Sequence, residues 1–244
     1  MPVETEILSE MKIERVPTYV RGLDERLEGG VPKGHVVLIS GAAGTMKSSF
    51  AFNVIYHAAK EKKNKGTYIT LEQGEKNLLK HMARLGMDVS TSKDIKERIS
   101  VVDLSQLRKD LGKQMSGDWI EPLIAQIKKY KERLGFEVLV LDSLQALYVL
   151  SNMQNPRNEL FFFFEQLRDL GLTSFLISEM SRDGETFGTY GIEDFLADGV
   201  IHLNLEREGR NVDRYLSVVK MRSTKHDTNY FPLLVENGFE IVTR

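Results

Sequence analysis

The sequence contains no cysteine. This absence excludes disulfide bonds, thiolate metal sites and catalysis by a thiol. The chain also lacks a stretch that is long and apolar enough to span a bilayer. Its first 18 residues carry acids where a signal peptide has a basic and then an apolar run. We therefore expect a cytoplasmic chain with no membrane segment.

Neither sign of charge dominates. The formal net charge is −2, and acidic and basic residues are mixed along the whole length, so no broad surface for nucleic acid or anionic lipid is indicated. The five histidines lack the spacing of metal ligands. The chain has no internal repeat and no low-complexity linker, and 41% of its 244 residues are hydrophobic. We expect one domain over residues 1–244, with residues 1–14 as an N-terminal extension.

Apolar runs alternate with amphipathic segments through the first 205 residues. Runs typical of strands occupy residues 34–40, 67–71, 99–104, 137–143, 173–178 and 199–205, and helical periodicity occupies residues 48–63, 75–86, 119–135 and 157–171. This alternation predicts an α/β fold whose mainly parallel sheet is covered by helices on both faces. The last 40 residues or so instead predict an antiparallel extension, with Pro232 on an edge strand.

A candidate phosphate-binding loop follows the strand at residues 34–40. Small residues let backbone N–H groups converge on phosphate oxygens at a helix N-terminus, while a lysine reaches the β- and γ-phosphates and a hydroxyl binds Mg²⁺. The predicted nucleotide-binding residues are Gly41, Ala42, Ala43, Gly44, Thr45, Met46, Lys47, Ser48 and Ser49. Met46 stands where the usual pattern has glycine, and a positive φ there would cost about 1 to 3 kcal/mol.

Two acidic residues end later strands. Asp142 follows the apolar run 138–141, and with Ser48 it would hold Mg²⁺. Glu72 ends the strand after the loop helix, where a base could orient the water that attacks the γ-phosphate. These positions predict an ATP site that uses Mg²⁺.

The ordered motifs resemble those of the KaiC-like branch of the RecA superfamily of ATPases, from about residue 13 to the C-terminus. They are "RVPTYVRGLDERLEGGVPKGHVVLISGAAGTMKS", "YITLEQ", "VLVLDS", "LISEM", "YGIEDFLADGVIHL" and "RYLSVVKMRSTKHD". The resemblance implies a RecA-type core that assembles head to tail into rings, often hexamers, with ATP between neighbours. It also implies that Lys220 and Arg222 reach the γ-phosphate of the adjacent subunit.

Three departures from the family's pattern bear on activity. Such sites commonly have glycine in place of Met46, and a second glutamate in place of Gln73. The resemblance therefore implies slow hydrolysis. The circadian clock protein of this family has a serine and a threonine that are autophosphorylated in its second domain. The corresponding positions here are Asp194 and Phe195, which have no hydroxyl, so autokinase activity is not expected.

Two other functions remain open at this point. A DNA-recombination ATPase of the RadA or RadB kind would line a central channel with the loops at residues 145–159 and 179–191, but these loops offer few cations. A scaffold that binds ATP without hydrolysing it is the second alternative. The function that the motifs favour is that of a regulatory or signalling ring with a protein client.

Overall fold

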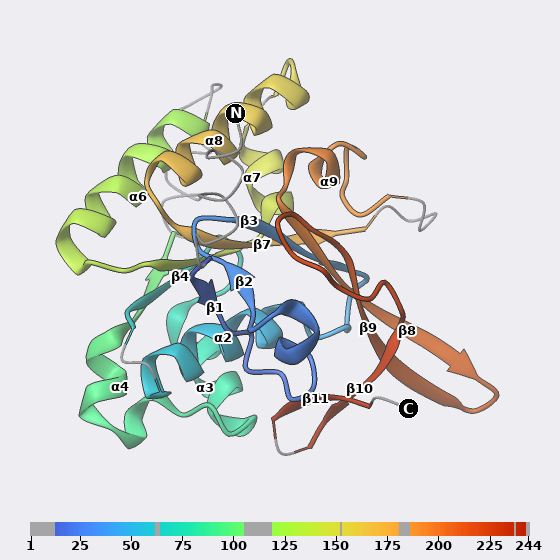
Figure 1. The fold of residues 1–244 in the computed structure, drawn as a ribbon. Coiled ribbons are helices and arrows are strands. Elements are labelled where there is room, and N and C mark those ends of the chain that lie inside the picture. The colour runs from blue at the N-terminus through green and yellow to red at the C-terminus, as the bar shows by residue number, and fades with distance from the viewer. Residues whose placement is uncertain are drawn as a thin grey trace, which may run out of the picture.

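The computed structural model describes residues 13–61, 64–104, 119–151, 153–180, 186–236 and 238–242. Within them a nine-stranded sheet forms the centre of the molecule (Figure 1). From one edge to the other its strands are β11 (Phe239–Ile241), β10 (Phe231–Val235), β9 (Asn211–Met221), β8 (Gly199–Glu208), β3 (Val36–Gly41), β7 (Thr173–Glu179), β6 (Val138–Asp142), β4 (Gly66–Thr70) and β5 (Ile99–Asp103).

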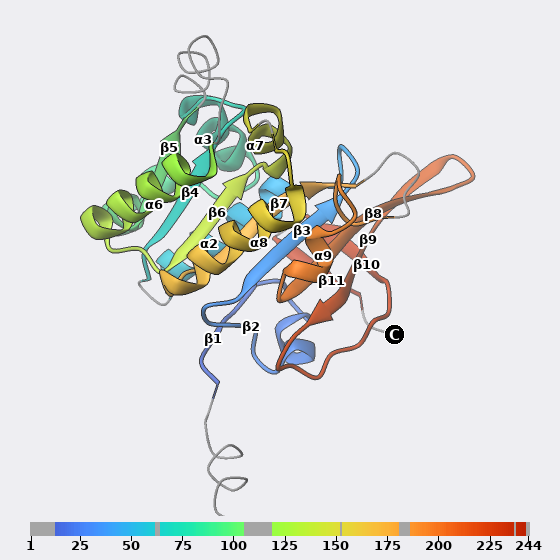
Figure 2. The same cartoon turned by 90° about the horizontal axis from the view of Figure 1, so that it is seen from above.

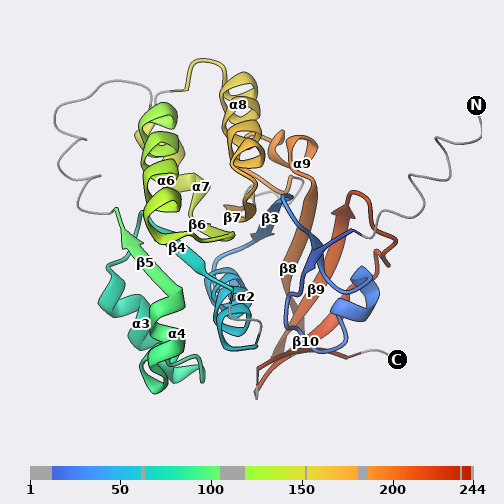
Figure 3. The same ribbon diagram turned by 60° about the vertical axis from the view of Figure 1, so that its left-hand side comes forward.

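The strands from β8 to β5 are mutually parallel, as the sequence predicts. Helices cover both of their faces (Figure 3). One face carries α2 (Lys47–Glu61), α3 (Glu75–Arg84) and α4 (Lys93–Arg98), and the other carries α6 (Ile120–Leu134), α7 (Leu144–Leu150), α8 (Pro156–Asp169) and α9 (Glu193–Leu196). Alternate residues of β3 enter the two cores, Val37 and Ile39 on the α2 side and Val36 and Leu38 on the other.

The C-terminal strands add to the sheet in antiparallel fashion. β8 and β9 form a long hairpin that projects beyond the neighbouring strands (Figure 2). Before the large sheet begins, β1 (Arg15–Val16) pairs with β2 (Val31–Pro32), and a short 3₁₀ helix, η1 (Asp24–Leu27), lies between them. The prediction of an edge strand for Pro232 is wrong, because β11 pairs with residues 233–235 and makes β10 the second strand from the edge. Pro232 still accepts a hydrogen bond through its carbonyl, from Val242 N.

Several local elements differ from the sequence prediction. Most of the loop expected at residues 145–159 is helical, because Ser143 caps α7 by accepting a bond from Ala146 N, and Asn155 caps α8 by accepting one from Asn158 N. The helices α4, η2 (Val89–Thr91) and α9 are too short for a clear periodic signal. Part of the second loop, residues 181–185, lies outside the described residues. No helix in the described ranges is both long enough and apolar enough to cross a membrane.

Candidate nucleotide site at the phosphate loop

The phosphate loop joins the buried strand β3 to the N-terminus of α2. A Cβ on Gly41 would lie 2.3 Å from the Leu203 carbonyl oxygen, so only glycine fits beside β8. Gly44 has φ of +85°, a conformation that side chains disfavour. Thr45 closes the turn, because its hydroxyl donates to Ala42 O at 2.9 Å. The loop is therefore built around the two glycines that the sequence singled out.

Met46 does adopt the left-handed conformation, with φ of 73°. Its partly buried side chain packs against the hydrophobic core on the α2 face. Its carbonyl accepts a hydrogen bond from Phe50 N at 2.9 Å, which ties it to the first turn of α2. Side-chain burial thus offsets part of the backbone strain that glycine would avoid.

The Lys47 ammonium lies over the loop. Its Nζ donates to the carbonyl oxygens of Gly41 and Ala42, each at 2.9 Å. Burial lowers the pKa of Lys47, although the charges of Glu179, Asp142 and Glu72 act in the opposite direction. A phosphate oxygen near this ammonium would add a negatively charged acceptor and favour the charged form.

Ser48, in the first turn of α2, contacts Asp142, the last residue of β6. β4 and β6 run in register, with Thr70 opposite Asp142, so both strands end at the same edge. The Ser48 hydroxyl donates to Asp142 Oδ2 at 2.8 Å, and the Tyr68 hydroxyl donates to the same oxygen. Burial raises the pKa of Asp142, while these two hydrogen bonds work against the rise.

These oxygens fit Mg²⁺. The described residues contain no cluster of three or more His, Cys, Asp or Glu able to hold a metal ion without other ligands. Mg²⁺ commonly takes one or two carboxylates and completes its shell with waters and substrate phosphates. A hydroxyl and a buried carboxylate beside a phosphate loop match that requirement.

Glu72 lies next to this pair. Its Oε1 accepts a hydrogen bond from the Ser143 hydroxyl at 2.7 Å, which orients the carboxylate beside Asp142. The Thr70 hydroxyl holds the turn that follows β4, accepting from Gln73 N and donating to Gln73 O. The structure therefore brings Lys47, Ser48, Asp142 and Glu72 to one end of the sheet.

A cavity of about 470 Å³ opens beside the loop, a size in the range of small-molecule sites. Its walls are Gly44, Met46, Lys47, Ser48, Ser49, Gln73, His81 and Arg214. Ser49 is buried, with its hydroxyl 3.5 Å from His81 Nε2. Cavities of about 410 and 330 Å³ also lie around His57 and Phe239, but none of the predicted site residues lines them.

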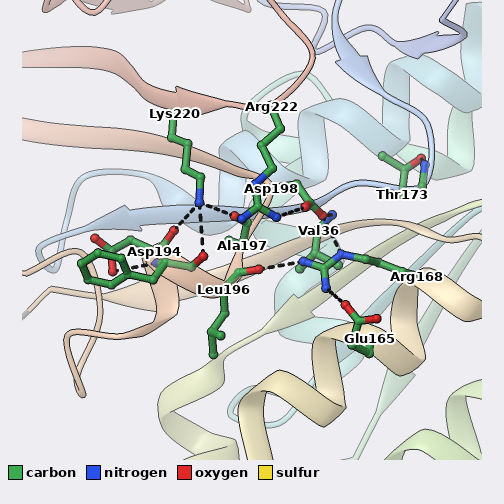
Figure 4. Close-up of polar contacts among 12 residues, drawn as sticks. Val36, Glu165, Arg168, Thr173, Asp194, Leu196, Ala197, Asp198, Lys220 and Arg222 are labelled. Atoms are coloured by element: carbon green, nitrogen blue, oxygen red, sulfur yellow. Dashed lines mark hydrogen bonds and ion pairs between the residues drawn. The ribbon is translucent and has the colours of Figure 1, made fainter. Parts of the chain in front are cut away.

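Strand pairing places Lys220 and Arg222 at the opposite end of the sheet, next to the first residues of β3 and β8. Figure 4 shows their polar contacts. Arg222 Nη1 donates to Asp198 Oδ1 at 2.8 Å, and Asp198 Oδ2 accepts from Val36 N at 3.0 Å. Val36 and Gly41 are the first and last residues of β3, so about 17 Å separates Arg222's partner from the phosphate loop at about 3.3 Å per residue. Neither side chain is placed to reach the phosphate loop of its own chain.

Sequence reasoning did not identify Tyr68, His81, Ser143 or Arg214 as neighbours of the site. Tyr68 lies in an apolar run, and its contact with Asp142 depends on the pairing of β4 with β6. Arg214 comes from β9, far along the chain. No local pattern marks these residues, because each one reaches the site through strand pairing or helix packing.

Comparisons with known proteins show the family and the fold of the chain. The family model described as "ATPase: KaiC" matches residues 16–243. The circadian clock oscillator protein KaiC of Thermostichus vulcanus is 26% identical over 239 residues, and the circadian clock protein KaiC3 of Synechocystis is 30% identical over 232 residues. These alignments cover 96% and 94% of this chain but 45% of each relative, so the chain spans about half the length of the curated relatives it matches.

A solved structure gives the same result. The crystal structure of a KaiC-like protein from Pyrococcus horikoshii superposes with a TM-score of 0.81 at 29% sequence identity, over 95% of this chain and 100% of the other. The shared architecture is the RecA-like one expected from the sequence, a mainly parallel sheet between helices with antiparallel strands at its C-terminal side. With a family model that matches nearly all of its length, the chain belongs to the KaiC family of ATPases.

Proposed function

We propose that this chain binds ATP with Mg²⁺ and hydrolyses it slowly, at sites shared between head-to-tail neighbours in a ring. The observation that carries the proposal is the separation of two sets of residues. Lys47, Ser48, Asp142 and Glu72 lie at one end of the sheet, whereas Arg222 is held by Asp198 at the other end. A head-to-tail contact would bring the second set of one chain to the first set of the next.

The residues divide the work of phosphoryl transfer to water. Backbone N–H groups at the N-terminus of α2 and the Lys47 ammonium would bind the phosphates. Ser48 and Asp142 would hold Mg²⁺, which when bound neutralises charge on the β- and γ-phosphates. Glu72, oriented by Ser143, would accept a proton from the attacking water. The water oxygen then bonds to the γ-phosphorus, the bond to the bridging oxygen breaks, and ADP leaves with that electron pair.

Slow turnover is expected from two features of the site, the residue that follows Glu72 and the conformation of the phosphate loop. Gln73 lies in the cavity wall and supplies no second carboxylate. Met46 holds a strained conformation in the loop that must fit the phosphates. We expect kcat below about 1 s⁻¹, the lower end of the usual range. Asp194 and Phe195 carry no hydroxyl, so the proposal includes no autophosphorylation at α9.

Subunit mixing tests the shared site. Arg222→Ala should bind ATP but hydrolyse it poorly, because an arginine finger mainly stabilises charge in the transition state. Glu72→Gln should also be inactive, for lack of a base. In rings mixed from the two variants, some interfaces pair the intact Glu72 of one chain with the intact Arg222 of the next. With random mixing at equal amounts, about one quarter of the interfaces are of this kind, so about one quarter of wild-type activity should return.

Arg157→Ala is the matched control, since Arg157 is an exposed arginine on α8. It should keep wild-type turnover. A mixture of Arg157→Ala with Glu72→Gln should show no more activity than the Arg157→Ala subunits contribute by themselves. Exchange is verified by fluorescence transfer between labelled subunits, and ring size by light scattering with and without ATP. If verified exchange gives no recovery, Arg222 does not complete a neighbour's site, and the shared-site proposal must be abandoned.

The two alternatives have simpler tests. A scaffold that does not hydrolyse ATP would release no phosphate under any of these conditions. A recombinase would be stimulated by DNA, but residues 179–191 contain one arginine against three acids, which disfavours a DNA channel. We therefore place a regulatory or signalling role, with a protein client, ahead of both.

A further inference from the structure

Lys220 holds the C-terminal end of α9. Its Nζ donates to Asp194 O at 2.8 Å, to Ala197 O at 2.7 Å and to Phe195 O at 3.4 Å (Figure 4). The last carbonyls of a helix have no partner within the helix, and an ammonium has three N–H donors. The three contacts therefore satisfy three carbonyls at the end of α9 and engage all three donors of Lys220.

The other end of α9 is held by Glu193, which is fully buried. Its carboxylate accepts from the Tyr148 hydroxyl at 2.9 Å and from the backbone N–H groups of Tyr190 and Ile192, each at 3.0 Å. Tyr148 belongs to α7, which begins two residues after Asp142. A helix of four residues is not stable alone. Arg168 Nη2 also donates to Leu196 O at 2.7 Å, so Glu193, Lys220 and Arg168 together decide where α9 lies.

Arg222 differs from Lys220 in its free donors. Its side chain is 52% exposed, and Asp198 is its one side-chain partner within the part of the chain that the structure describes. Asp198 in turn is fixed by Arg168 Nε at 2.9 Å and by Val36 N. Arg222 can thus bind an external acceptor without leaving Asp198, whereas Lys220 can do so only by releasing α9.

We infer that Lys220 is a positioning residue for α9, and that a γ-phosphate in the neighbouring subunit competes with the α9 carbonyls for its ammonium. This inference rests on the proposed shared site. Charged phosphate oxygens are stronger acceptors than neutral carbonyls. The Lys220 contacts that hold α9 are therefore kept when the neighbour carries ADP and lost when it carries ATP. Because Tyr148 joins α9 to α7, the state of one site reaches the helix that follows Asp142 in the next chain.

The first test uses the chain without nucleotide. Lys220→Met should raise amide hydrogen exchange about tenfold or more in residues 193–197, because three of the four carbonyls bonded at the end of α9 lose their partner and only the Arg168 contact remains. The amide of Asp198, bonded to Val36 O in the sheet, should change little and serves as an internal reference. Lys225→Met is the matched control, since Lys225 is exposed and its replacement also removes one positive charge. Unchanged exchange in Lys220→Met would overturn the inference.

The second test compares nucleotides at equal ring size. In the Glu72→Gln background, which preserves bound ATP, α9 should exchange faster with ATP than with ADP. A lysine that merely supports the fold would give equal protection with both nucleotides, and equal or greater protection with ATP rejects the release step. If neither nucleotide supports a ring, the proposed function fails instead, and the nucleotide-free comparison alone decides whether Lys220 positions α9.

Discussion

Alanine usually gives a more stable protein than glycine at the same position. The left-handed conformation of Met46 predicts the opposite order for Met46→Ala and Met46→Gly. At φ of 73° any residue with a Cβ is strained, by about 1 to 2 kcal/mol. Both Met46→Ala and Met46→Gly remove the packing of the side chain against the core on the α2 face. Only Met46→Gly also removes the Cβ. The difference between the two variants therefore isolates the strain.

The magnitude follows from two opposing terms. Relief of strain favours glycine by about 1 to 2 kcal/mol, and the greater freedom of glycine in the unfolded chain favours alanine by about 0.4 to 1 kcal/mol. The net expectation is that Met46→Gly is more stable than Met46→Ala by about 1 kcal/mol. For a chain of this length that corresponds to about 2 to 4 °C in Tm. Relative to wild type, Met46→Gly should change little, because it loses packing as it loses strain.

The assay is thermal or urea unfolding of the three proteins, followed by ATP binding and phosphate release. Wild type should bind ATP with a Kd of about micromolar order, and Met46→Gly should turn over equally fast or faster. If Met46→Ala is as stable as Met46→Gly, or more stable, the strain argument is refuted. If wild type fails to bind ATP while Met46→Gly binds it, Met46 disables the site rather than slowing it.

Two further predictions concern the same end of the sheet, and a third concerns DNA. Gly41→Ala should destabilise the protein strongly, by a clash with Leu203 O, whereas Gly74→Ala, whose nearest contact would be 3.4 Å, should unfold near the wild-type temperature. Asp142→Asn should be more stable than wild type at pH 7 while losing Mg²⁺-dependent turnover. Burial raises the pKa of Asp142, so the folded state binds more protons than the unfolded state, and stability falls as the pH rises through the two pKa values. A lower Tm for Asp142→Asn at pH 7 would contradict this. Single- or double-stranded DNA should leave ATPase activity nearly unchanged, and several-fold stimulation at physiological salt would favour the recombinase alternative.

Local patterns were enough to predict the parallel strands and most of the helices. Buried strands such as β3 and β6 are continuous apolar runs, and their carboxyl ends meet at one edge of a parallel sheet. This rule places Asp142 and Glu72 near the phosphate loop without coordinates. It does not predict their partners. The contacts of Tyr68 with Asp142 and of Ser143 with Glu72 depend on which strands are neighbours and in which register.

The sequence by itself therefore determined the α/β class, the phosphate loop with its glycines, and the exclusion of thiol chemistry, because each of these depends on residue types at short spacing. Only the tertiary structure decided that Arg222 lies at the opposite end of the sheet from Lys47, and that Lys220 is engaged by α9. Those placements come from the antiparallel return of β9 along β8 and from contacts between residues more than 20 positions apart. Hydrophobic periodicity is local, so it carries no information about them.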